Sequence, residues 1–121
     1  MTFVEAIQSV LSNYANFSGR ARRSEYWYFV LLSVIVSAVL GVLAQIPFLG
    51  MVATLLSGVW SLAIIVPSLA LGWRRLHDIG KSGIWFLIVL VPLVGEILLF
   101  IWMCKDSQPG ENQYGPNPKG F

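Results

Sequence analysis

Charge is the scarcest property of this sequence. Asp, Glu, Lys and Arg make up 12% of the 121 residues, whereas hydrophobic residues make up 56%. A soluble globular domain is about one quarter charged, and a chain of this length could not bury so much apolar surface in its own core. The composition therefore argues against a soluble domain and favours a single membrane domain over residues 1–121.

Cysteine and histidine are nearly absent, with one residue of each, Cys104 and His77. A lone cysteine cannot form an internal disulfide, and no Cys/His spacing typical of zinc occurs. The polar residues 105–121 lack the regular oxygen spacing of a calcium loop. A Walker loop, a dinucleotide fingerprint and a nucleophile elbow are also missing. We therefore predict no metal, no cofactor and no nucleic-acid partner.

Long apolar runs are what the sequence does contain. The 48 positions between Glu25 and Arg74 hold no Asp, Glu, Lys or Arg. A helix of about 20 apolar residues crosses the hydrocarbon core, so this run has room for two spans, with Pro47 and Gly50 at the turn. We predict spans at 26–46, 51–73 and 84–104, all helical because lipid offers the backbone no hydrogen-bond partner.

The chain begins with a segment that reads as a short amphipathic helix. Thr2 and Glu5 have the spacing of a capping box, in which each side chain binds the other residue's backbone N–H. Apolar residues recur along one side at helical spacing: Phe3, Ile7, Val10, Leu11 and Tyr14. We expect this helix to rest on the membrane surface or on the spans. The predicted fold is all-α, with three transmembrane helices after this amphipathic one.

Small residues recur every four positions along the first two spans. They are Ser33, Ser37 and Gly41 in the first span and Ala53, Ser57 and Ser61 in the second. Small residues at this spacing let helices approach closely in lipid, so we expect the two rows to face each other.

Basic residues gather beside the predicted spans. Six of the eight precede the first span or separate the second from the third: Arg20, Arg22, Arg23, Arg74, Arg75 and Lys81. Short cytoplasmic loops are rich in Lys and Arg, so residues 1–25 and 74–83 should face the cytoplasm. Three crossings would then place the polar tail, 105–121, on the outside.

A second arrangement of the third apolar run would change the side of the tail. Residues 92–96 could form the tip of a re-entrant hairpin, with arms 84–91 and 97–104 entering and leaving on the cytoplasmic side. Each arm would supply only about 12 Å of helix, and re-entrant backbone needs cover from protein or a water-filled cavity. A straight crossing needs no such cover and matches the 21-residue length, so the sequence favours three spans.

The six basic residues are candidate ligands for anionic lipid. Arginine grips phosphate bidentately, and a cation near an anionic leaflet gains about 1 kcal/mol. The simpler interpretation is that they only orient the chain. We expect Glu25, His77 and Asp78 to pair with them in a polar cap. These residues favour a non-enzymatic membrane component that binds anionic lipid or a partner protein.

Two other function classes stay open. His77 beside Asp78 could be an acid–base pair, so an enzyme acting on a phosphorylated lipid would use them with Arg74 and Arg75. Glu96 lies inside the third run, where an acid costs a few kcal/mol, and would serve a small transporter subunit. No nucleophile adjoins His77, and one acid in three helices is a poor transport path. We therefore assign no catalytic residue.

Three polar motifs resemble one known family. They are NFSGRARRSEYWYF at 16–29, RRLHDIGKSG at 74–83 and DSQPGENQYGPNP at 106–118. In this order they resemble the small bacterial inner-membrane proteins typified by YhaH and YhaI, the domain of unknown function 805. The resemblance covers almost the whole chain. It implies a compact multi-pass protein of the bacterial inner membrane, and it implies no reaction and no catalytic residues.

Overall fold

The computed structural model describes residues 2–118, and over that range it is helical with no strand. Its elements are α1 (Phe3–Ser12), α2 (Arg23–Leu43), α3 (Gly50–Asp78), the 3-10 helix η1 (Gly83–Leu90) and α4 (Val94–Cys104). The prediction of an all-α fold is confirmed for this part of the chain.

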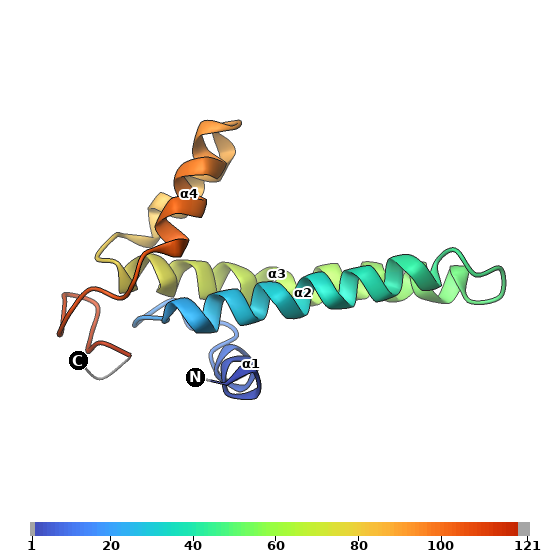
Figure 1. Ribbon diagram of the computed structural model, residues 1–121, viewed down its shortest axis with the longest axis horizontal. Coiled ribbons are helices and arrows are strands. Elements are labelled where there is room, and N and C mark those ends of the chain that lie inside the picture. Colours follow the sequence, from blue (N-terminus) through green and yellow to red (C-terminus); the bar gives the residue numbers. More distant parts are fainter. Residues whose placement is uncertain (1, 119–121) are drawn as a thin grey trace.

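Helices α2 and α3 run side by side as a long hairpin (Figure 1). Their 21 and 29 residues give lengths of about 32 and 44 Å, enough to cross a hydrocarbon core of about 30 Å. The most apolar stretch of each helix is only 6% and 11% buried within the fold, unlike the core helix of a soluble protein. Within residues 2–118, these two helices are long and apolar enough to span a membrane.

The two rows of small residues do not meet as predicted. Ala53 is buried, but Ser37, Gly41 and Ser61 are exposed, and a methyl group added to Gly41 would touch nothing. The hydroxyls of Ser57 and Ser61 donate to carbonyls four residues earlier in their own helix. The hairpin is held mainly at its polar end instead, by a small core of Val10, Ala21, Phe29 and Leu71.

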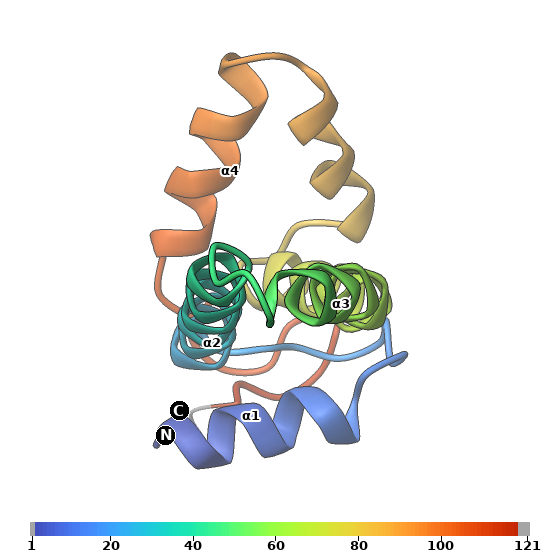
Figure 2. The same ribbon diagram turned by 90° about the vertical axis from the view of Figure 1, so that its right-hand side faces the viewer.

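Helix α1 lies across the α2–α3 pair (Figure 2). The predicted capping box is confirmed, because the Thr2 backbone N–H donates to Glu5 and the Glu5 N–H donates to the Thr2 hydroxyl. Val10 is buried against the long helices, whereas Leu11 and Tyr14 of the same stripe remain exposed. The helix therefore rests on the long helices with part of its apolar stripe uncovered.

Residues 84–104 do not form the single helix that we predicted. Helix η1 ends before a turn at 91–93, and α4 runs back from it (Figure 2). Pro92 has no N–H and disfavours helix at the residue before it, and Leu93 has a φ of +67°. Gly95 lets α4 approach η1, since a Cβ there would lie 1.6 Å from the Ile88 carbonyl oxygen. The prediction of one straight helix over 84–104 is therefore wrong.

The hairpin of η1 and α4 leaves the end of α3 and brings the chain back to that end, where the tail follows. The Gln108 N–H donates to the Asp78 carbonyl at 2.8 Å, so the chain after α4 returns to the end of α3 (Figure 1). The tail therefore lies beside the charged end of α3, and not at the end where the turn at 44–49 lies. This chain path is that of the hairpin alternative, which the sequence disfavoured.

Candidate functional site

The polar end of the α2–α3 hairpin buries charged and polar side chains from three distant parts of the chain. They come from the segment before α2 and its first turn, from the last turns of α3 and from the tail. We call them the polar cluster, which consists of Arg20, Glu25, Arg74, Arg75, His77, Asp78 and Ser107.

Asp78 lies at the centre of the polar cluster and is fully buried. Its Oδ1 accepts from Arg20 Nε at 3.0 Å, and its Oδ2 accepts from Arg75 Nη1 at 3.0 Å and from the Ser107 hydroxyl at 2.6 Å. Helix α3 places Asp78 and Arg75 one turn apart, and the returning tail supplies Ser107. The carboxylate is thus already engaged by three donors of the same chain.

Arg20 binds the tail to α3 with its whole guanidinium group. Besides Nε on Asp78, Nη1 donates to the carbonyls of Gly110 and Gly115, and Nη2 donates to the carbonyls of Asp78 and Gln108. A guanidinium has five N–H donors, and here each one has an acceptor. Since the side chain is only 1% exposed, Arg20 has no donor left for a phosphate.

Arg74 and Glu25 join the first three helices. Arg74 Nη1 donates to Glu25 Oε1 at 3.1 Å, and the same oxygen accepts from the Ser9 hydroxyl of α1 at 2.9 Å. Arg74 Nε also donates to the Asn16 carbonyl. The side chains of Arg74 and Glu25 are each 4% exposed, so this ion pair is an internal contact.

Arg75 is buried completely and ties α3 to the end of α4. Its Nη2 donates to the carbonyls of Met103 and Lys105. The hydrogen bonding of Arg75 is less complete than that of Arg20, because Arg75 Nε is buried with no hydrogen-bond partner among residues 2–118. Arg74 Nη2 is likewise buried with no partner in that range. Taking such charges out of water costs several kcal/mol per ion, which only close pairing offsets.

His77 connects the first polar motif to the third. Its Nδ1 lies 2.8 Å from the Gly19 carbonyl, and because a carbonyl only accepts, Nδ1 carries the proton. The imidazole stacks on the Tyr114 ring with centroids 3.9 Å apart and planes 2° apart. The Asn112 amide donates to the His77 carbonyl. This is the environment of a histidine that holds segments together.

The other three predicted cations lie at the edge of the polar cluster. We call Arg22, Arg23 and Lys81 the rim cations. Arg23 is exposed and makes one bond to the Cys104 carbonyl, while Arg22 and Lys81 are half-buried. The Lys81 ammonium lies 4.7 Å from the Trp102 ring centroid. The structure thus divides the six predicted lipid ligands into three buried arginines and three rim cations.

Glu96 lies at the far tip of the η1–α4 hairpin, away from the polar cluster. Its Oε2 accepts from the Leu93 N–H at 3.1 Å, at the start of α4, and the residue is exposed. The first turn of a helix favours a carboxylate because the free N–H groups and the helix dipole point toward it. The geometry therefore gives this acid a capping contact.

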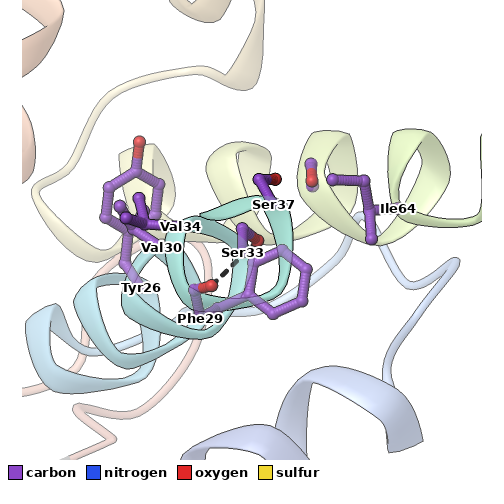
Figure 3. Close-up of a pocket in the computed structure, with 8 residues that line it drawn as sticks. Tyr26, Phe29, Val30, Ser33, Val34, Ser37 and Ile64 are labelled. Carbon is purple, nitrogen blue, oxygen red and sulfur yellow. Dashed lines mark hydrogen bonds between the residues drawn. The ribbon is translucent and has the colours of Figure 1, made fainter. Parts of the chain in front are cut away.

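An apolar groove of about 410 Å³ runs between α2 and α3 beyond the polar cluster (Figure 3). Its lining residues are Tyr26, Phe29, Val30, Ser33, Val34, Ser37, Ile64 and Ser68. The lining includes no Asp, Glu, Lys, Arg or His, and the Ser33 hydroxyl donates to the Phe29 carbonyl of its own helix (Figure 3). The groove offers contact to apolar chains and no acid–base pair.

The tail residues are what residue-by-residue reasoning missed. Ser107, Gln108, Asn112 and Tyr114 all bind Arg20, His77 or Asp78, although none was a candidate. The available signal was the grouping of polar residues into three motifs with apolar runs between them. Within residues 2–118, no three His, Cys, Asp or Glu side chains gather as a metal site would require.

Comparison with known proteins identifies the family. A family model described as protein of unknown function (DUF805) matches residues 14–116. Inner membrane protein YhaI of Escherichia coli (strain K12) is 47% identical over 111 residues, which is 92% of this chain and 92% of YhaI. Inner membrane protein YhaH of the same strain is 40% identical over 114 residues, 91% of this chain and 93% of YhaH. No solved structure matches the chain. The chain belongs to the DUF805 family.

Proposed function

We propose that this member of the DUF805 family is a small non-enzymatic protein of the bacterial inner membrane that binds anionic lipid headgroups through its rim cations. Helices α2 and α3 cross the membrane. The polar cluster, residues 1–25 and the tail lie on the cytoplasmic side. The named location of YhaI and YhaH supports the membrane assignment, and the two long apolar helices agree with it.

The orientation follows from the distribution of cations. All six basic residues of the first two polar motifs lie at one end of the α2–α3 hairpin, and the turn at 44–49 has none. Short segments rich in Lys and Arg stay in the cytoplasm. Because the tail packs on Asp78, it shares that side.

One observation carries the functional part of the proposal, namely the division of the six cations. Arg20, Arg74 and Arg75 are buried and bonded within the chain, so they act as structural contacts. The rim cations remain at the surface beside the predicted membrane boundary, where each cation gains about 1 kcal/mol from an anionic leaflet. Lipid binding therefore falls to the rim cations and not to all six.

The same geometry disfavours the enzyme that we considered. A general base must reach a substrate proton, but Asp78 is fully buried and already accepts from Arg20, Arg75 and Ser107. His77 donates to Gly19 and is covered by Tyr114. A transporter path through Glu96 is disfavoured too, because that acid caps α4 at an exposed tip.

The test is lipid retention after purification from vesicles of phosphatidylethanolamine and phosphatidylglycerol. The wild type should be enriched in phosphatidylglycerol, and replacing each rim cation by Gln should lower the enrichment about fivefold. Arg23→Lys is the control, since it changes an exposed side chain and keeps its positive charge. High salt should reduce the enrichment because exposed charges are screened. Equal retention of both lipids at low salt would contradict the proposal.

A further inference from the structure

The surface of the η1–α4 hairpin is apolar on every side. Ten large apolar side chains between Ile84 and Ile101 are exposed, and the buried residues from 83 to 104 are Gly83, Gly95 and Met103. A helix that packs on one protein partner needs only one apolar stripe, whereas a helix that is apolar all round is buried on all sides. The hairpin therefore requires a surrounding that covers it completely.

The two arms are too short to cross a membrane. Helix η1 has 8 residues, about 16 Å at the 3-10 rise, and α4 has 11 residues, also about 16 Å. The hydrocarbon core is about 30 Å thick. Even if it pointed straight in, the hairpin would reach only to about the middle. In the structure it stands at a large angle to α2 and α3 (Figure 1), which keeps it in the nearer leaflet.

The base of the hairpin carries the side chains that favour a membrane–water boundary. Trp85 and Trp102 meet edge to face with centroids 6.0 Å apart, and Lys81 lies over both rings. The Trp27 indole N–H donates to the Met103 carbonyl at 3.0 Å. Tryptophan and lysine concentrate at this boundary because each combines an apolar body with a polar end. The base of the hairpin, where η1 begins and α4 ends, thus lies at the level at which the rim cations meet the headgroups.

The turn at the tip satisfies its own backbone. The Leu93 N–H is bound by Glu96, the Val94 N–H by the Pro92 carbonyl and the Gly95 N–H by the Val91 carbonyl. Pro92 has no N–H to satisfy. Non-helical backbone survives at membrane depth only when its polar groups are bonded within the protein. Placing the Glu96 carboxylate at this tip costs free energy. The contact of the carboxylate with the start of α4 offsets part of that cost.

We propose that the η1–α4 hairpin is embedded in the hydrocarbon of the leaflet next to the polar cluster and is covered by lipid acyl chains, entering and leaving on the same side. This proposal rests on the membrane placement of α2 and α3 given above. The hairpin exposes large apolar side chains, as α2 and α3 do. The hairpin then anchors the polar cluster at a fixed depth, because Arg75 and Arg23 hold the base of the hairpin through the carbonyls of residues 103–105.

The test uses single cysteines with a fluorescent label in a Cys104→Ala background, in vesicles of phosphatidylethanolamine and phosphatidylglycerol. Leu90→Cys reports the hairpin, Val39→Cys reports α2, and Gln113→Cys reports the aqueous tail, all three positions being exposed. Nitroxides on the upper acyl chain should quench Leu90 more strongly than nitroxides at the chain end. Aqueous iodide should quench Leu90 severalfold less than Gln113.

Three outcomes would overturn the hairpin proposal, each in its own way. Iodide quenching at Leu90 equal to that at Gln113, with Val39 in lipid, would place the hairpin in water. A Leu90 probe shielded from both quenchers would mean that protein, such as a second copy, covers the hairpin. A Val39 probe outside lipid would remove the membrane placement itself. Loss of anionic-lipid preference alone would affect only the role of the rim cations.

Discussion

At the scale of single residues, the arginines divide by burial and not by sequence position. Arg20 and Arg23 belong to the same motif, yet one is buried with five bonds and the other is exposed with one. Their sequence context predicted lipid contact for both. Three of the five acceptors of Arg20 are carbonyls of the tail, about 90 residues away, and the other two belong to Asp78, 58 residues away, so no local pattern could reveal them.

The first prediction concerns the geometry of Arg20. Arg20→Ala should lower the free energy of unfolding by about 3–5 kcal/mol, the usual cost of breaking a buried pair. Arg20→Lys should lose most of that amount, because an ammonium has three donors and cannot reproduce the planar fork. Chemical unfolding in detergent measures both.

Arg23→Lys is the matched control for this substitution. It should change stability by less than about 0.5 kcal/mol, since Arg23 is exposed. Equal losses for Arg20→Lys and Arg23→Lys would show that the five bonds of Arg20 do not stabilise the fold.

A second prediction at this scale concerns pH. The Thr2 backbone N–H donates to the Glu5 carboxylate, and this bond, with a smaller effect of the Thr2 side chain, lowers the pKa of Glu5 below the ordinary value of 4.5. A lowered folded pKa stabilises α1 above the unfolded pKa, and this contribution is lost as pH falls through the folded pKa. The protection factors of the α1 amides against hydrogen exchange should therefore fall on acidification.

The control for the pH effect is Glu5→Gln, which keeps a possible acceptor but cannot titrate. Its α1 exchange should depend less on pH than that of the wild type. If both proteins lose protection over the same pH range, the effect does not come from the cap at Glu5.

At the scale of elements, local sequence patterns correctly predicted the features that depend on contacts between residues close in the chain. The capping box at Thr2 and Glu5, the long helix after Glu25 and the turn near Pro47 all follow from spacing, run length and turn chemistry. The third apolar run was misjudged because its length fits a crossing and its composition is uniform. Pro92, Leu93 and Gly95 break it, and the close approach at Gly95 is visible only once the two arms are paired.

This difference yields a prediction for Gly95→Ala. The new methyl group would meet the Ile88 carbonyl oxygen, a backbone atom that cannot move without opening the tip. We expect a loss of about 1–3 kcal/mol in unfolding free energy, the usual cost of overpacking. Thermal unfolding in detergent measures it.

Gly58→Ala is the control within a helix. A methyl group there meets nothing within 4 Å, so the change should be neutral or stabilise by about 0.5–1 kcal/mol. A Gly95→Ala protein as stable as Gly58→Ala would mean that the two arms do not pack as closely as the structure has them.

At the scale of the whole molecule, the central feature is that three polar motifs form one buried cluster at one end of a long apolar hairpin. The sequence predicted that two of them share a face, from their basic residues, and the hairpin alternative for the third apolar run would have placed the third motif with them. Span counting overrode that suggestion, because a count of crossings cannot detect a helical hairpin. The bonds from Ser107 and Gln108 to Asp78 decide the placement in the structure.

The measurement that tests this account most directly is the sidedness of the tail. Single cysteines replace Gln113 in the tail, Ser82 after α3 and Phe48 in the distal turn, in a Cys104→Ala background, because all three positions are exposed. A membrane-impermeant thiol reagent is applied to intact spheroplasts and to lysed ones. The account predicts that Gln113 and Ser82 react only after lysis, whereas Phe48 reacts in both. Reaction of Gln113 together with Phe48 in intact spheroplasts, with Ser82 protected, would contradict the single polar cluster.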